Sequence, residues 1–215
     1  MIISDSKDLS VIIDFIKANK RIAFDIETTG LNPRKESIVG FGVSNESEGH
    51  YVIHQKYENE RLVEVISKQD CIAILELLAK SEWIGWNCSF EARFCLHYFG
   101  VDLKNSIWSD GMLLKHSVDE NMPFALKEVA ESLYGSEAKL EQVEMIQSVK
   151  ANGGSEKEYF KANADLLGKY CIQDCLLTFK INEHYLRDLK LQRLEDFFFK
   201  DEVMPMLKEV VTCLS

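Results

Sequence analysis

Two acidic residues, Asp25 and Glu27, stand two positions apart inside the apolar stretch RIAFDIETTG at residues 21–30. On a β-strand, side chains two apart point to the same face, so both carboxylates project together while Phe24 and Ile26 face the other way. Desolvated carboxylates side by side need a positive partner, which can be a basic side chain, shared protons or divalent cations. The alternative is a solvent-exposed strand end with two harmless acids, because the short D-x-E pattern is common.

Two later segments offer further polar side chains at helical spacing. In WNCSFEARF, Asn87 and Glu91 are four residues apart. In YCIQDC, Tyr170 and Asp174 have the same spacing. Residues four apart share one face of a helix, so the members of each pair can act together. The alternatives are an N-cap role for Asn87, a helix-dipole role for Glu91 and core packing for Tyr170.

Together, the three segments supply four carboxylates and one phenol. Hard oxygen ligands without histidine or cysteine favour Mg²⁺ or Mn²⁺ over zinc. Two such ions a few ångströms apart can activate a water and stabilise the leaving oxygen of a phosphodiester. The set therefore predicts a site for phosphoryl transfer with two divalent ions.

The elements that must position these side chains form an α/β pattern. Short apolar runs bounded by turn residues predict strands, and apolar residues at helical spacing predict helices. We expect strands at 21–28, 37–45, 50–54 and 82–87, and helices at 8–19, 71–80, 88–99, 124–135, 155–189 and 191–214. Gly100 is a plausible C-terminal cap, and Asn152-Gly153-Gly154 marks a loop. The predicted architecture is a mixed sheet of about five strands flanked by helices.

Composition restricts the class of protein. The chain has 215 residues, of which 46% are hydrophobic, which suits one domain with a sizeable core. No apolar run approaches the roughly 20 residues of a membrane span, and the N-terminus does not read as an export signal. We therefore expect a cytoplasmic or nucleoid protein. The net charge of −10 argues against a long footprint on duplex DNA, but it permits a short contact mediated by metal ions.

The cysteines have no C-x-x-C spacing, so neither a zinc knuckle nor a disulfide framework is indicated and buried free thiols are expected. They are Cys71, Cys88, Cys95, Cys171, Cys175 and Cys213.

The three polar segments, taken in order, resemble the motifs of the DEDD superfamily of 3′–5′ exonucleases. The resemblance is to the tyrosine subtype, and in particular to the proofreading domain of family A DNA polymerases. FDIETTGL, WNCSFEARF and YCIQDC are similar to its first, second and third motifs, and SDGMLLKHSV and FALKEVAESLYG are similar to the helical segments between them. The resemblance spans roughly residues 20–190 and implies a ribonuclease-H-like fold with Asp25 and Glu27 on the central strand.

The resemblance also implies a role for each residue of the site. Asp25 would bridge both metal ions, Glu27 and Asp174 would complete the shell of the first ion, and Tyr170 would orient the attacking water. The spacing of four before Asp174 selects the tyrosine subtype, since the histidine subtype places its base five before, where this chain has Lys169.

Four more positions match residues that meet nucleic acid in this family. Thr28 and Leu31 would contact the terminal nucleotide, Leu31 as an apolar wedge against the last bases. Asn87 and Phe90 would line the single-strand path, where base stacking tolerates any sequence. The alternative for Leu31 and Phe90 is ordinary packing.

One residue departs from the family pattern. Glu91 stands where the second motif has aspartate, and one extra methylene displaces its carboxylate in a site that is sensitive to misplacements of about 1 Å. The second ion could be weakly held, displaced, or bound directly by Glu91 where an aspartate would act through water, and we expect an active but slow enzyme. Asp102 and Asp110 are alternative acids, but Asp110 better fits an N-cap.

We therefore predict a metal-dependent 3′–5′ exonuclease of the proofreading type, acting on single-stranded or frayed DNA 3′ ends. Residues 1–190 would form the nuclease domain, and 191–215 a C-terminal helix that begins a connection to a DNA polymerase portion, in the same or a separate chain. Two alternatives remain. One is an impaired domain that only binds nucleic-acid ends, and the other is a stand-alone RNA-trimming nuclease of the same superfamily.

Overall fold

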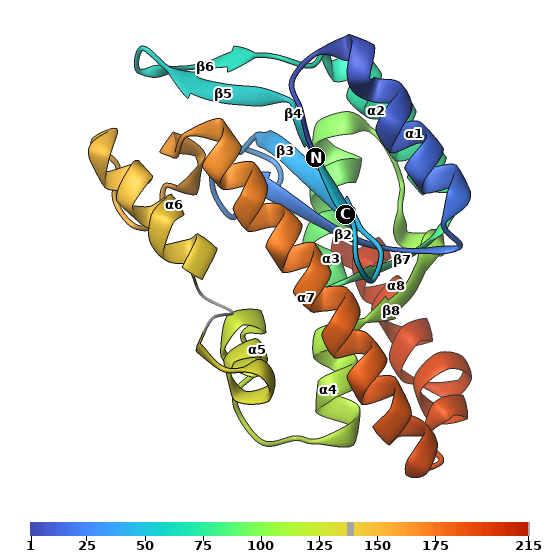
Figure 1. Cartoon of the computed structure of the whole chain (residues 1–215). Coiled ribbons are helices and arrows are strands. Elements are labelled where there is room, and N and C mark those ends of the chain that lie inside the picture. The colour runs from blue at the N-terminus through green and yellow to red at the C-terminus, as the bar shows by residue number, and fades with distance from the viewer. Residues whose placement is uncertain (137–139, 215) are drawn as a thin grey trace.

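Helices surround one mixed β-sheet in the computed structural model, which describes residues 1–136 and 140–214 (Figure 1). The sheet has six strands in the order β1-β4-β3-β2-β7-β8. Its strands are β1 (Ile2–Ile3), β2 (Arg21–Thr28), β3 (Ile38–Ser44), β4 (Gly49–Ile53), β7 (Glu82–Gly85) and β8 (Ile107–Asp110). β2 pairs antiparallel with β3 and parallel with β7, so it lies inside the sheet with a neighbour on each side.

The longest helix, α7, crosses one face of the sheet in front of β2 and β3 (Figure 1). The helices are α1 (Leu9–Ala18), α2 (Lys68–Leu78), α3 (Cys88–Phe94), α4 (Gly111–Val118), α5 (Leu126–Tyr134), α6 (Leu140–Ala151), α7 (Ala164–Leu191) and α8 (Val203–Leu214). α7 also packs against α4, α5 and α6. Because it touches both the central strands and the outer helices, α7 can carry side chains into a site at the middle of the sheet.

The α/β class is confirmed, with corrections to single elements. The helix expected over 191–214 is one of them, because α7 ends at Leu191 and α8 begins only at Val203. The sheet has six strands rather than about five, and β1 and β8 were not among the strands expected, because runs of two and four residues are too short for a period-2 pattern to indicate them. A separate hairpin, β5 (Gln55–Glu58) and β6 (Arg61–Glu64), was not predicted. The helix expected from residue 155 begins only at Ala164, because the Asn163 side chain caps it by accepting from the backbone amides of Asp165 and Leu166.

The core is built on the apolar face of β2. Phe24 is buried and meets Trp83 of β7 edge-on, with ring centroids 5.4 Å apart. Asp25 and Glu27 lie on the opposite face, toward α7, as the alternation of a strand requires. All six cysteines are free thiols, as expected, although Cys213 is exposed and only the other five are buried.

No helix within residues 1–136 and 140–214 is long and apolar enough to cross a membrane.

Candidate active site

Asp25 and Glu27 meet a thiol from α7. Cys171 Sγ lies 3.8 Å from Asp25 Oδ2 and 3.8 Å from the Asp25 carbonyl oxygen. One ligand atom each from Asp25, Glu27 and Cys171 fall within 4.8 Å of one another. Glu27 is only 7% exposed. The expectation of a purely oxygen-lined cluster, without cysteine, was therefore wrong.

A glycine opposite Asp25 allows α7 to come this close. Gly42 of β3 is the register partner of Asp25. A Cβ atom at Gly42 would stand 2.8 Å from Cys171 Sγ and 3.0 Å from Cys175 Sγ, nearer than side chains tolerate. The absence of a side chain at this position thus sets the depth at which α7 carries its residues toward β2.

Glu91 enters from α3 and is buried, at 3% exposed. Its Oε2 atom has no hydrogen-bond partner among the described residues. Burial raises the pKa of Glu91 well above its ordinary value, and the nearby charge of Asp25 raises it further. A buried carboxylate oxygen without a donor is the kind of atom that a cation satisfies.

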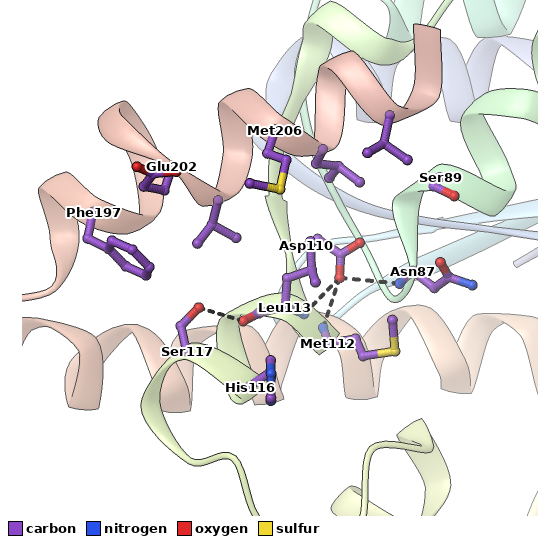
Figure 2. A pocket seen from close by; sticks show the side chains of 13 residues that line it. Asn87, Ser89, Asp110, Met112, Leu113, His116, Ser117, Phe197, Glu202 and Met206 are labelled. Carbon is purple, nitrogen blue, oxygen red and sulfur yellow. Dashed lines mark hydrogen bonds between the residues drawn. The ribbon is translucent and has the colours of Figure 1, made fainter. Parts of the chain in front are cut away.

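Asp110 holds the helix that carries Glu91. Its carboxylate accepts hydrogen bonds from the backbone amides of Cys88 at 2.7 Å, Met112 at 3.0 Å and Leu113 at 3.1 Å. Figure 2 shows this carboxylate between the first residues of α3 and α4. The N-cap interpretation of Asp110 is confirmed, and it ties two helix starts together rather than one.

Asp102, the other alternative acid, is exposed and pairs with Lys104 at 3.5 Å.

Tyr170 and Asp174 share a face of α7, and both are buried. Burial raises the pKa of the Tyr170 phenol well above its ordinary value, and the Asp174 charge adds to the rise, so the hydroxyl stays protonated. Tyr170 does more than fill the core, because its hydroxyl hydrogen-bonds with the Asp174 carboxylate while its ring packs on Tyr159.

Lys127 of α5 is the residue that sequence reasoning missed. It is only 8% exposed, its Nζ contacts Asp174 Oδ1, and the same atom lies 4.8 Å above the Tyr170 ring. Burial raises the pKa of Asp174, and the Lys127 charge opposes that rise. Lys127 precedes Asp174 by 47 positions, so no local spacing links the two residues.

The four carboxylates outnumber the nearby cation. Burial, then the charge of Asp174, raises the pKa of Asp25 from 3.8 to about 7. Burial, then the charges of Asp25 and Asp174, raises the pKa of Glu27 well above its ordinary value. Carboxylates with raised pKa values either bind protons or bind a cation that replaces them. The donor set and the unpartnered Glu91 oxygen both fit divalent metal ions.

The four residues expected to meet nucleic acid have different settings. Leu31, in the loop after β2, is 85% exposed, so packing does not explain it. Thr28 donates its hydroxyl to the Gly30 carbonyl at 2.7 Å and so shapes the same loop. Phe90 packs on Phe94, with ring centroids 4.7 Å apart, and is partly buried.

Asn87 occupies the N-cap position of α3 with a left-handed backbone, at φ 73°, but its side chain makes no capping hydrogen bond. The amide side chain is exposed at one end of a cavity of about 600 Å³ between α3, α4 and α8 (Figure 2). The N-cap alternative therefore describes the backbone of Asn87 but not its side chain.

A comparison with protein families matches residues 1–190 to a family described as 3′–5′ exonuclease. The chain belongs to this 3′–5′ exonuclease family. The resemblance read from the three motifs is thereby confirmed at the level of the family. No curated protein sequence matches this chain.

Solved structures share the fold at low sequence identity. Escherichia coli RNase D, described as an exoribonuclease involved in structured RNA processing, matches with a TM-score of 0.69 and 11% identity over 98% of this exonuclease and 50% of its own chain. Brucella melitensis NrnC with bound Mg²⁺ matches with a TM-score of 0.60 and 15% identity, over 99% of this chain and 90% of the NrnC chain. The catalytic core of RRP6 from Trypanosoma brucei, as its C496S mutant, matches with a TM-score of 0.61 and 13% identity, over 98% of this chain and 51% of the RRP6 chain.

These similarities confirm the ribonuclease-H-like fold. The exonuclease spans about half the length of the RNase D and RRP6 chains but nine-tenths of the NrnC chain.

Proposed function

We propose that this protein is a divalent-metal-dependent enzyme that hydrolyses the terminal phosphodiester at the 3′ end of single-stranded or frayed DNA. The observation that carries the proposal is the convergence of buried carboxylates from β2, α3 and α7 on one face of the sheet, with the pKa values of Asp25 and Glu27 raised by burial and mutual repulsion. Such a cluster is costly to keep unless it binds cations.

Asp25, Glu27, Glu91 and Asp174 would hold the ions. Bound there, Mg²⁺ or Mn²⁺ would lower the pKa of a water and offset the charge of the leaving oxygen. The chain's own groups complete the chemistry. The neutral Tyr170 hydroxyl can donate a hydrogen bond to the attacking water, and Lys127 holds Asp174 and the Tyr170 ring in place.

Substrate contacts follow from the loop after β2 and the start of α3. The exposed Leu31 offers an apolar surface to the last base, and the free Asn87 amide offers donors and acceptors to the strand. The net charge of −10 suits an enzyme that grips a few terminal nucleotides rather than a long stretch of phosphates. A polymerase portion, in the same or a separate chain, would supply the remaining grip.

A second candidate substrate is RNA. It is favoured by the fold shared with RNase D, which is described as an exoribonuclease, and with the RRP6 core. Both candidates use the same hydrolysis, so they differ only in the sugar that the site admits.

The test compares DNA and RNA oligonucleotides of one sequence, labelled at the 5′ end and incubated with Mn²⁺. A ladder of shortened labelled products supports 3′–5′ hydrolysis, and faster shortening of RNA would favour the second candidate. Asp25→Asn should lower the rate by at least about a hundredfold, as loss of a preorganised charge does. Asp102→Asn, an exposed acid in a surface ion pair, is the matched control. Intact nucleic acid that is nevertheless bound would support the alternative of an end-binding domain, and a ladder that survives Asp25→Asn would refute the assignment of the site.

A further inference from the structure

Cys171 does not belong to the carboxylate set, yet its sulfur stands among the candidate ligands. Its Sγ lies 3.8 Å from Asp25 Oδ2, and the three ligand atoms of Asp25, Glu27 and Cys171 fall within 4.8 Å. Glu91 and Asp174 are not part of this tight group of three.

The carboxylate beside the thiol lacks a protein partner. Glu27 is more than nine-tenths buried, and within the part of the chain that the structure describes its carboxylate has neither a hydrogen bond nor an ion pair, although the charge of Lys127 acts on it from a distance. The Oε2 atom of Glu91, also buried, is unpartnered. A cation in the group of three would satisfy the Glu27 carboxylate, which the described residues leave without a hydrogen bond or ion pair.

We propose that Cys171 Sγ is a metal ligand together with Asp25 and Glu27, so that this site binds thiophilic divalent ions such as Zn²⁺ or Cd²⁺ in preference to Mg²⁺ and is blocked by them. The predicted inhibition rests on the proposed function, because there must be a reaction to inhibit. The predicted binding of the ion does not. On binding, the ion forms a bond to sulfur and the thiol proton leaves to solvent.

Ligand chemistry separates the two kinds of ion. Thiolate sulfur selects Zn²⁺ and related soft ions, whereas Mg²⁺ takes oxygen. Sulfur and oxygen ligands around a tetrahedral Zn²⁺ stand roughly 3.6 Å apart. Cys171 Sγ and Asp25 Oδ2 are already 3.8 Å apart, and all three ligand atoms lie within 4.8 Å, so the group closes with at most about 1 Å of side-chain movement. An ion held by sulfur is displaced from the position that serves the reaction, and a shift of about 1 Å is enough to cost rate.

A spectroscopic titration tests the proposal without relying on activity. In a Cys213→Ser background, which removes the exposed thiol, Cd²⁺ should produce ultraviolet charge-transfer absorption from thiolate sulfur that saturates at one equivalent. Cys171→Ala should abolish this absorption and weaken Cd²⁺ and Zn²⁺ binding by at least about tenfold, the lower end of what even outer-shell contacts contribute. Mg²⁺ affinity should change far less, because Mg²⁺ has little use for sulfur.

Cys71→Ala is the matched control, since Cys71 on α2 is equally buried and lies outside the group of three. It should keep the absorption. Absorption that survives Cys171→Ala, or is missing from the parent, would overturn the proposal. Cadmium NMR of the parent chain gives the same answer without a substitution at the site, because a sulfur ligand shifts the resonance away from the all-oxygen position.

The two hypotheses fail separately. A Mg²⁺-dependent ladder without thiolate absorption would leave the exonuclease intact and remove the Cys171 site. Absorption that depends on Cys171, in a protein that shortens no oligonucleotide, would support the Cys171 site and refute the proposed nuclease activity.

Discussion

Replacing Lys127 with methionine removes the cation that contacts Asp174 and leaves a side chain of similar length in a buried position. Removing one partner of a buried ion pair costs about 3–5 kcal/mol, because the other charge stays desolvated. We therefore expect the metal-free variant to lose about that much unfolding free energy at pH 8.

The loss should depend on pH. Without Lys127, the folded-state pKa of Asp174 rises further above its unfolded value, so the stability it contributes is present at low pH and is lost as pH rises. One extra proton bound by the folded variant returns up to about 2.7 kcal/mol between pH 8 and pH 6. Excess Mn²⁺ should reduce the loss in the same way, because the ions supply the missing positive charge.

Urea unfolding in EDTA, followed by tryptophan fluorescence at pH 6 and pH 8, measures both effects. The control is Lys115→Met. Lys115 is also buried, but it donates to the Asp119 carbonyl at 2.8 Å and pairs with the half-exposed Asp119 carboxylate. The unfolding free energy that Lys115→Met loses should not depend on metal or on pH between 6 and 8. Contacts with Asn121 and Lys115 lower the pKa of Asp119 below 3.8, so Asp119 does not titrate in this range. An equal loss for Lys127→Met at both pH values, with or without Mn²⁺, would refute the role of Lys127 as the counter-ion of the cluster.

Three further predictions concern other parts of the site. Because the pKa of Asp25 rises from 3.8 to about 7 on folding, the metal-free wild type should lose about 3 kcal/mol of unfolding free energy between pH 4 and pH 7. Thermal unfolding in excess Mn²⁺ should show a flatter profile, and a metal-free profile that is already flat would contradict the burial of this charge. Glu91→Asp should raise the Mn²⁺-dependent rate, by up to about a hundredfold if the carboxylate is misplaced by 1 Å, whereas an unchanged rate and metal affinity would show the substitution to be silent. Gly42→Ala should cost about 1–3 kcal/mol in urea unfolding, because the new methyl group would stand 2.8 Å from Cys171 Sγ, and a neutral result would mean that α7 can move away.

Local patterns were sufficient to predict the β2 acids and the Tyr170–Asp174 pair. Asp25 and Glu27 follow from the period of a strand, and Tyr170 and Asp174 from the period of a helix, and neither needs tertiary information. The N-cap at Asp110 was also predictable, because a capping side chain bonds to backbone amides two and three residues along.

Lys127 and Cys171 could not be assigned in this way. The Lys127–Asp174 contact joins residues far apart in sequence, and it forms only because α5 packs against α7. Cys171 was expected to be a buried thiol and is one, but its distance to Asp25 depends on how deeply α7 sits, which Gly42 controls across the sheet.

The hairpin of β5 and β6 lacked its usual signal. Asn59 and Glu60 both have positive φ, at 52° and 61°, as a two-residue turn of this kind requires. The second residue of such a turn is normally glycine, and this chain has Glu60 there, so the sequence did not predict the turn. The strand residues are mostly polar or half exposed, so periodicity gave no second indication.

Anomalous diffraction from crystals soaked in Mn²⁺ tests the central claim most directly, because it locates the ion without reference to activity or substrate. We predict a peak within coordination distance of the Asp25 and Glu27 carboxylates, on the face of the sheet that α7 covers. A map with no peak beside those two side chains, at a Mn²⁺ concentration that supports oligonucleotide shortening in solution, would contradict the account.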